Sequence, residues 1–314
     1  MQFGIHIGTR GCLTTRENIM AVAQRAETLG YTHLGVADHL IVPMQTGVRY
    51  PYTADGIWPG APTGECFDCI ATLAFIAGCT RTLKLLTSVA VVPHRPAVLA
   101  AKLFMTADVL SGGRVIAGVG TGWMREEFEA LGTPPYDERG AVTDEYLTAW
   151  CALWAEPRPK LDGKYAKFDN VVFAPKPAAR PHLPIWVGGE SPPALRRTVK
   201  FGDAWYPVSN NQTIKLNTPE RLRDGIGKLH RTAEKARRDP STIEVAYLWF
   251  GAPVWGTPEG QRQLFSGASS DMLADAAALE QAGATTVILY LQRPTIGETL
   301  DVIQRFGEEV VRNA

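Results

Sequence analysis

The sequence predicts an α/β fold, a (β/α)8 barrel with insertion segments, and three observations support this prediction. Short apolar runs that suit buried parallel strands alternate with segments of helical periodicity along the chain. The chain has 314 residues and is 45% hydrophobic, which is enough for one barrel-sized core. Distinctive polar or glycine-rich stretches follow several of the predicted strands, and on a barrel such strand ends share one rim. We therefore expect residues 1–314 to form a single domain.

The expected strands and helices alternate along the whole chain. A helix after the first strand has Thr14 or Thr15 as its N-cap and ends at Gly30. The strands are expected at residues 2–7, 32–37, 83–92, 114–119, 184–187, 203–206, 243–250 and 286–291. Further helices are expected at residues 67–78, 96–110, 137–154, 195–201, 219–237, 271–282 and 296–310, and residues 165–173 could form a small hairpin.

The composition excludes several classes of protein. Basic and acidic residues are equal in number, 32 each, so the net charge is zero and no basic stripe indicates nucleic acid or a membrane surface. A strand-like run already at residue 3 does not fit a signal peptide, and the apolar runs are too short to span a bilayer. The five cysteines are an odd number, which indicates free thiols and a cytoplasmic location.

Two of the cysteines, Cys66 and Cys69, form a C-x-x-C motif. A zinc site would need a second pair or histidines at ligand spacing, and none follows. A thioredoxin-like motif would need a preceding strand, but a proline- and glycine-rich loop precedes it. We interpret the motif as a coincidence at the start of a helix.

The stretch at residues 114–132 passes from a buried strand through a glycine-rich turn into a helix. Gly118, Gly120 and Gly122 would let a flat or phosphorylated ligand approach the backbone, although a tight turn explains them equally well. A Rossmann dinucleotide site is rejected because Trp123 stands where the third glycine of G-x-G-x-x-G is needed. In the helix, Met124, Phe128 and Leu131 share an apolar face, and Glu126 and Glu127 suit the first turn.

Three other predicted strand ends carry candidate residues. Asp38 and His39 follow the second strand, and a histidine beside a carboxylate can transfer a proton near neutral pH. The third strand contains Ser88 and Val89. The strand at 184–187 runs into Gly188, Gly189, Glu190 and Ser191, where Ser191 is the N-cap candidate before Pro192 and the backbone N–H groups could bind an anion.

The remaining candidates are two histidines and a loop. His94 follows the third strand and could face a pocket, and His6 could point into the barrel. Without a clear third ligand these histidines do not make a metal site. No G-x-S-x-G motif or pair of acids at a strand end indicates hydrolase or glycosidase chemistry. The long loop at residues 43–64 carries Tyr50, Tyr52 and Trp58, which favours a lid.

These motifs together resemble the luciferase-like monooxygenase superfamily, and within it the branch that uses the deazaflavin coenzyme F420. The matching segments are A-D-H-L at residues 37–40, T-S-V at 87–89, D-V-L-S-G-G-R-V at 108–115, G-V-G-T-G-W-M-R-E-E-F-E-A-L-G at 118–132, P-I-W-V-G-G at 184–189 and G-D-A-W at 202–205. They span most of the chain in the family's order.

The resemblance implies a (β/α)8 barrel that usually forms a homodimer, with a non-prolyl cis peptide behind the deazaflavin ring. In this chain the cis bond falls at Ser88–Val89. Asp38 matches a ring contact, and His39 matches the histidine near the hydride-bearing carbon. The cofactor contacts implied are Asp38, Ser88, Val89, Gly120, Thr121 and Gly122, with Gly188, Gly189, Glu190 and Ser191 around the phosphate tail.

Two positions depart from the sugar-phosphate dehydrogenases of this branch. Trp123 stands in place of an acidic residue, and residues 41–43 lack the tryptophan that follows the D-H motif. A sugar phosphate is therefore not the expected substrate. An apolar or aromatic molecule fits better beneath Trp123, Trp58 and His94.

We therefore expect an oxidoreductase that transfers hydride between coenzyme F420 and a small organic substrate, with His39, oriented by Asp38, moving the proton. The main alternative is an FMN-dependent monooxygenase that uses molecular oxygen. A non-catalytic flavin-binding protein and a metal-dependent barrel hydrolase are more remote alternatives.

Overall fold

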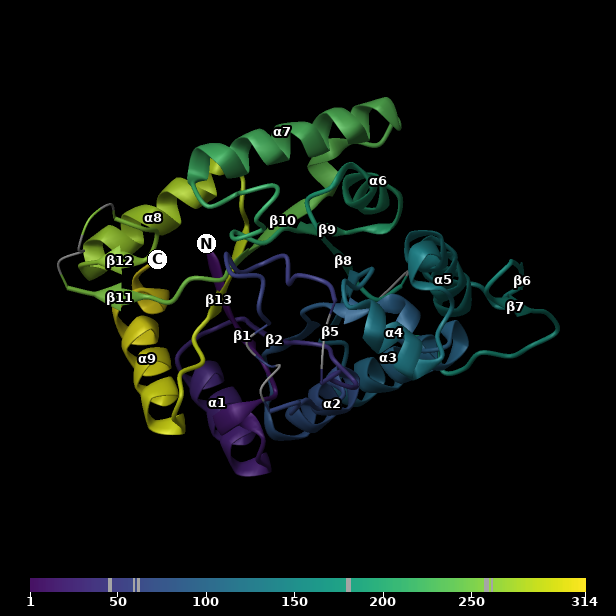
Figure 1. Ribbon diagram of the computed structural model, residues 1–314, viewed down its shortest axis with the longest axis horizontal. Coiled ribbons are helices and arrows are strands. Elements are labelled where there is room, and N and C mark those ends of the chain that lie inside the picture. Colours follow the sequence, from purple (N-terminus) through teal and green to yellow (C-terminus); the bar gives the residue numbers. More distant parts are fainter. Residues whose placement is uncertain (45–46, 59, 61–62, 179–181, 257–259, 261) are drawn as a thin grey trace.

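The computed structural model describes residues 1–44, 47–58, 60, 63–178, 182–256, 260 and 262–314. Its helices are arranged around a central set of strands (Figure 1). The barrel strands are β1 (Gln2–Ile7), β2 (His33–Val36), β3 (Lys84–Thr87), β4 (Ala90–Val91), β5 (Val115–Gly120), β8 (Ile185–Gly188), β9 (Ala204–Tyr206), β10 (Glu244–Trp249) and β13 (Thr286–Tyr290). The helices are α1 (Arg16–Thr28), α2 (Cys69–Cys79), α3 (Ala97–Ser111), α4 (Arg125–Leu131), α5 (Arg139–Ala155), α6 (Pro192–Phe201), α7 (Pro219–Lys235), α8 (Ser269–Ala282) and α9 (Ile296–Glu309).

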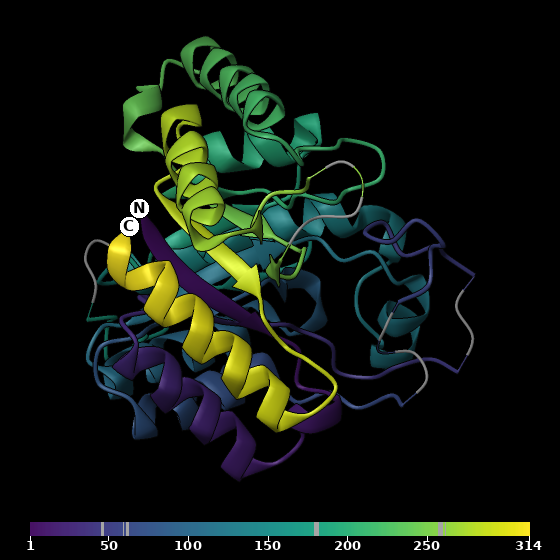
Figure 2. The same cartoon turned by 90° about the vertical axis from the view of Figure 1, so that its left-hand side faces the viewer.

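The strands form a closed parallel barrel, as the sequence predicts. Their order is β3-β2-β1-β13-β10-β9-β8-β5-β4, and pairing of β3 with β5 closes the sheet. The first and last strands are neighbours, with Gln2 opposite Thr286 and His6 opposite Tyr290 (Figure 2). Because β3 and β4 are two halves of one predicted strand, the barrel has eight strand positions.

The predicted strand at 83–92 is wrong in one respect, since it is not continuous. It is interrupted at Ser88–Val89, where the peptide bond is cis. The other predicted barrel strands agree with the structure to within one or two residues at each end. The cis bond itself, expected from the resemblance, is confirmed.

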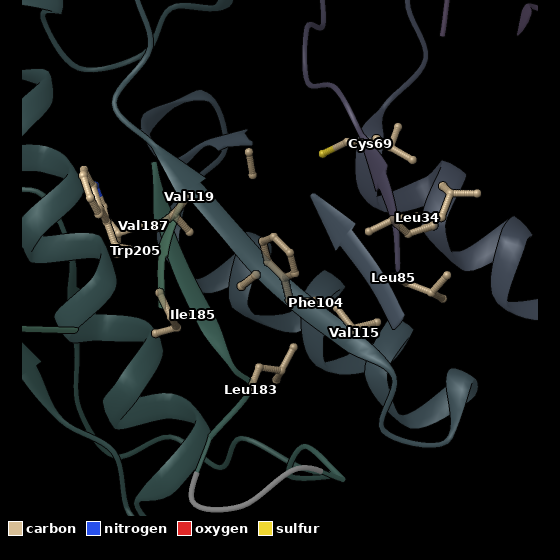
Figure 3. Close-up of a cluster of buried hydrophobic side chains, with 14 of the residues drawn as sticks. Leu34, Cys69, Leu85, Phe104, Val115, Val119, Leu183, Ile185, Val187 and Trp205 are labelled. Carbon is tan, nitrogen blue, oxygen red and sulfur yellow. The ribbon is translucent and has the colours of Figure 1, made fainter. Parts of the chain in front are cut away.

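Side chains of the barrel strands alternate between two cores. One set points outward against the helices, including Leu34, Leu85, Val115, Ile185 and Val187 (Figure 3). The other set fills the inside of the barrel and comprises Leu86, Ile116, Trp186, Ala204, Tyr206, Val208, Ala246, Leu248 and Ile288. This strict alternation is why runs that look uniformly apolar in the sequence can serve both faces of the sheet.

Several predicted helix starts are confirmed by their caps. Thr15 accepts a hydrogen bond from Asn18 N–H at the start of α1, and Ser191 accepts one from Ala194 N–H at the start of α6. Asp68 caps α2, and Cys69 is the first helical residue. The cysteines of the described residues are free, so the C-x-x-C motif is a feature of a helix start.

The small hairpin lies earlier than predicted. It consists of β6 (Leu161–Asp162) and β7 (Lys167–Phe168), whereas residues 165–173 were expected. The Glu145 carboxylate on α5 accepts hydrogen bonds from the backbone N–H groups of residues 164, 165 and 166, which fixes the turn there. A second short pair, β11 (Val254–Trp255) with β12 (Ser266–Gly267), follows β10.

No helix in the described part of the chain is long and apolar enough to cross a membrane.

Candidate functional site

The carboxyl ends of the barrel strands enclose a cavity of about 210 Å³. Strand ends, the turn after β5 and the loop between β2 and α2 all contribute to its wall. Most predicted site residues line this cavity, namely Asp38, His39, Trp58, Ser88, Val89, Gly120, Thr121, Gly122, Trp123, Gly188 and Gly189. The prediction that these separate stretches share one mouth is therefore confirmed.

His39 is held by a carboxylate, but not by the predicted one. Its Nδ1 lies 2.9 Å from Oε2 of Glu127, the third residue of α4. Burial by itself raises the pKa of Glu127, but the hydrogen bond from His39 and the backbone N–H of Leu40 outweigh it, so the pKa is lowered. Because an ionised carboxylate can only accept, Nδ1 carries the hydrogen, and Nε2 is the nitrogen available to a ligand.

The prediction that Asp38 orients His39 is wrong. Both oxygens of Asp38 accept hydrogen bonds from the Arg95 guanidinium, at 2.8 and 2.9 Å, and Oδ2 also accepts one from Val91 N–H. Burial raises the pKa of Asp38, but the Arg95 charge more than reverses this, so the pKa is held well below its usual range. Arg95 also pairs with Asp68, so it ties the end of β2 to the cap of α2.

His94 does not line the cavity, so its predicted place in the substrate pocket is wrong. Its ring is buried and lies edge-on to Phe128, with ring centroids 4.8 Å apart. Neither ring nitrogen has a hydrogen-bond partner among the described residues, and Nδ1 is 3.9 Å from Glu127 Oε1. Burial lowers the pKa of His94 despite the Glu127 and Asp38 charges, so the ring is neutral and acts as packing behind Glu127.

A chain of buried polar groups supports the bend in the third strand. Ser88 Oγ lies 2.8 Å from His6 Nδ1 and 2.8 Å from the Tyr206 hydroxyl. Burial and the Arg10 charge lower the pKa of His6 to about 3, so this histidine is neutral. His6 lines the cavity, as its place in the first strand suggested. The hydrogen bonds fix Ser88 between β1 and β9.

The glycines around the mouth serve the protein's own packing. A Cβ at Gly120 would lie 2.7 Å from Val89 Cγ2, and one at Gly188 would lie 3.3 Å from Val89 Cγ1. At Gly122 it would meet Phe128 and Val91 at 2.7 Å, and the positive φ of 81° also favours glycine. They leave room for the bent third strand and for α4. Gly120, Gly122 and Gly188 also line the cavity, so the expectation that glycines here let a ligand approach the backbone stays a prediction.

The predicted anion cradle at the start of α6 has few donors. Pro192 and Pro193 have no N–H, and Ala194 N–H is already bonded to Ser191 Oγ. Glu190 and Ser191 do not line the cavity. Glu190 is buried, and its carboxyl group accepts hydrogen bonds from Val208 N–H and Asn211 Nδ2. Burial outweighs these bonds and raises the pKa of Glu190 to about 7.

The described part of the loop at 43–64 covers the mouth, as a lid would. Its three aromatic side chains, Tyr50, Tyr52 and Trp58, all line the cavity. Trp58 lies against His39 with ring centroids 4.3 Å apart, and Tyr50 lies 5.0 Å from Trp123. The loop is fastened by Asn210 Nδ2, which donates to Tyr52 O, and by Glu126 Oε1, which accepts from Gly47 N–H.

Three residues that build this site are not predicted from the sequence. The sequence places Glu127 in the first turn of a helix but gives it no partner, and it predicts no role for Arg95 or Tyr206. An arginine in an otherwise apolar stretch after a strand is a usable signal, because a buried guanidinium needs a carboxylate partner. Nothing in the sequence pairs Tyr206 with Ser88. Among the described residues, no group of three or more His, Cys, Asp or Glu side chains could hold a metal.

A closed parallel barrel of eight strand positions with helices around it is the fold of the luciferase-like class. The chain belongs to the luciferase-like monooxygenase family, whose model matches residues 1–289. It is 32% identical over 248 residues to an uncharacterised Mycobacterium tuberculosis protein, an alignment that covers 74% of this chain and 86% of that protein. It is 34% identical over 134 residues to the FMNH2-dependent dimethylsulfone monooxygenase of Pseudomonas putida, covering 42% and 36% of the two chains.

Solved structures share the fold over essentially the whole chain. The monooxygenase RslO1 from Streptomyces bottropensis superposes with a TM-score of 0.76 at 20% identity, covering 100% and 99% of the two chains. The coenzyme F420-dependent tetrahydromethanopterin reductase from Methanopyrus kandleri gives 0.74 at 16% identity, with 99% of each chain covered. The family is one of oxidoreductases and monooxygenases, and these similar proteins include one named as dependent on coenzyme F420 and one named as dependent on FMNH2.

Proposed function

We propose that this protein is an oxidoreductase that transfers hydride between coenzyme F420 and a small apolar or aromatic organic substrate. The observation that carries the proposal is the His39–Glu127 pair, which opens onto a cavity at the mouth of the barrel. A hydride transfer to or from an organic substrate needs a partner for the proton, and such a pair can supply or take it.

The wall of the cavity fits a planar ring. Val89 lines the cavity between Gly120 and Gly188. Because these two residues have no side chains, this part of the wall is apolar and does not project into the cavity. Trp58 and Trp123 line the lid side of the same cavity. When bound, the deazaflavin would supply hydride chemistry at its C5 position. Ser88 and Val89 would support the ring from behind, and Thr121 and Gly189 would contact its side chain.

The protein's own residues supply position and proton transfer. Glu127 fixes the tautomer of His39, so Nε2 is the nitrogen that can take a proton from the substrate or give one to it. Trp58 covers one side of the His39 ring. Tyr50 and Tyr52 close the mouth, which excludes water from the substrate and lowers the local dielectric constant. The apolar lining is why we expect an apolar or aromatic substrate.

FMN-dependent monooxygenation is the second candidate function. It is supported by the 34% identity to the dimethylsulfone monooxygenase, whose name states dependence on FMNH2. A planar apolar wall accepts either ring. Coenzyme F420 is preferred because the sequence segments that match most of the chain resemble the deazaflavin branch.

Ligand titration separates the two functions. Oxidised coenzyme F420, FMN and nicotinamide nucleotides would be added to the purified protein at matched concentrations, with binding followed by fluorescence and absorption. We expect tight binding of F420 and weak binding of the others. Tight binding of FMN without F420 binding would contradict the proposal. Binding of F420 without hydride exchange under any donor or acceptor would indicate a non-catalytic carrier.

We also propose that the protein is a homodimer. Exposed apolar side chains follow one face of α3, where Leu99 is 50% and Leu110 is 73% exposed, and Leu103 lies between them. Phe75 on the neighbouring helix α2 is also exposed. A contiguous apolar face of this kind indicates a protein interface. The same face of a second copy is a suitable partner, because a two-fold contact pairs one apolar patch with itself.

A further inference from the structure

A strongly basic groove lies between α6 and α7, and none of its described lining residues lines the cavity. It has a volume of about 840 Å³, and we call it the basic groove. Its lining comes from one face of each helix, at helical spacing, and from the residues after α7. The lining residues include six cations: Arg196, Lys200, Lys228, Arg231, Lys235 and Arg238.

These cations have no acidic neighbours in the groove. No aspartate or glutamate is among the described residues that line it. None of the six forms an ion pair within the described part of the chain, although Arg238 donates to the backbone carbonyls of Thr198 and Val199. In a chain of zero net charge, six cations gathered without counter-charges make a local field that attracts anions.

The basic groove begins beside the cavity. Pro192, the first residue of α6, lines the groove, and Gly188 and Gly189, only a few residues earlier, line the cavity. From Pro192 to Lys200 the helix rises by about 12 Å, at about 1.5 Å per residue. An extended chain covers about 3.3–3.6 Å per residue, so roughly four residues would follow the groove along α6.

The start of α6 also lacks the donors that usually bind a phosphate. Its first two positions are prolines, and Ser191 satisfies the third N–H. An anionic ligand that leaves the cavity over this helix start therefore finds side-chain cations rather than backbone donors. This arrangement suits a long, multiply charged tail better than one compact phosphate.

We propose that the basic groove binds the anionic tail of the deazaflavin coenzyme, whose ring lies in the cavity. This inference rests on the proposed function. Coenzyme F420 carries a phosphate diester and a chain of glutamates, whereas FMN ends in a single phosphate. Only the former has enough negative charges to engage cations on both helices. A groove that starts beside the cavity and runs along two helices also suits an extended tail better than the surface of an acidic protein.

The test compares the coenzyme with and without its tail. The probes are F420 with several glutamates, the same deazaflavin chromophore without phosphate or glutamates, and FMN. The proteins are the wild type, the double variant Lys228→Glu/Arg231→Glu and the control Arg223→Glu. Arg223 is an exposed cation on the same helix that lies outside the groove. Binding is measured by fluorescence titration at low and at raised salt.

We expect the wild type to bind tailed F420 more tightly than the tail-free chromophore. The double variant should bind tailed F420 about 10-fold more weakly, since two exposed cations are reversed. Raised salt should remove most of the tail's advantage, because exposed charges are screened. Binding of the tail-free chromophore and the behaviour of Arg223→Glu should match the wild type. Lys228→Gln/Arg231→Gln should show a smaller loss, and circular dichroism checks that each variant is folded.

The outcomes distinguish the two proposals. If tailed and tail-free deazaflavin bind the wild type equally, or if the double variant retains full affinity for tailed F420, the groove assignment is wrong and the proposed function stands. If the double variant weakens the tail-free chromophore as well, the cations act on the ring site and the assignment is also wrong. If the wild type binds FMN but neither deazaflavin, the proposed function fails and the groove assignment fails with it.

Discussion

His39 and Glu127 are 88 residues apart in the sequence, yet His39 Nδ1 donates a hydrogen bond to Glu127 Oε2 at 2.9 Å. The bond joins the end of β2 to the first turn of α4, and both side chains are largely withdrawn from solvent. Glu127 also accepts from Leu40 N–H at 2.7 Å, so the carboxylate is fixed against the backbone that carries the histidine. We regard Glu127 as the positioning residue for His39.

Replacing Glu127 by glutamine should lower kcat by about 10- to 100-fold, part of the effect that a positioned acid or base provides. The pH profile of kcat should change, because a neutral amide replaces the ionised carboxylate that pairs with His39. Coenzyme affinity should change little. Steady-state kinetics across a pH series measure both effects, and Glu129→Gln, an exposed carboxylate on the same helix, is the control. An unchanged pH profile with reduced kcat would argue for a purely structural role.

Replacing Arg95 by methionine should destabilise the fold by about 3–5 kcal/mol, because Asp38 would remain as a buried charge without its partner. The double variant Asp38→Asn/Arg95→Met should recover part of this loss. Urea unfolding gives the free energies of unfolding. The Asp38–Arg95 pair contributes least to the stability of the folded state at acidic pH. The pKa of Asp38 is depressed in the folded state, so the stability it contributes is present above its ordinary value of 3.8 and is lost as the pH falls through the folded value. A loss below 1 kcal/mol at neutral pH would contradict this account.

Glu190→Gln tests a carboxyl group whose contribution to stability has the opposite pH dependence. Burial raises the pKa of Glu190 to about 7 in the folded protein, above its ordinary value of 4.5. The folded state therefore holds this proton more tightly, and the resulting stability is present below pH 4.5 and is lost as the pH rises to about 7. The wild type should lose about 3 kcal/mol over this range from Glu190 alone, at about 1.4 kcal/mol per pKa unit.

The glutamine variant should show a flatter dependence of unfolding free energy on pH than the wild type. Urea unfolding at several pH values across this range measures the slope. Glu234→Gln, an exposed carboxylate on α7, should leave the slope unchanged. Identical slopes for the wild type and Glu190→Gln would show that this carboxyl group stays ionised when buried.

Charged substitutions on α3 test the proposed homodimer. The double variant Leu99→Glu/Leu103→Glu should dissociate the assembly, since carboxylates would have to be desolvated in an apolar interface. Sedimentation velocity measures the mass. Val172→Glu, at another exposed apolar position that is 90% accessible, should leave the assembly intact. A wild type that sediments as a monomer at all concentrations would contradict the proposal.

Much of the fold was predictable because it depends on local patterns. The eight apolar runs, the cap at Thr15 and the cap at Ser191 are properties of a few neighbouring residues, and the structure confirms them. The strand ends could also be assigned to one rim, because parallel strands followed by helices leave no other arrangement on a barrel. The cis bond at Ser88–Val89 was expected only from the resemblance to a family.

Local sequence patterns are sufficient to predict the barrel and the stretches that meet at its mouth. They do not predict which charged groups pair, because those pairs form between distant segments. Asp38 is adjacent to His39 in the chain, but successive side chains at a strand end point in different directions, so Asp38 faces Arg95 and His39 faces Glu127. The need for glycine at positions 120 and 188 also follows only from tertiary packing, because a side chain at either position would crowd Val89. Contacts between residues far apart in the chain depend on how layers pack, which local periodicity does not encode.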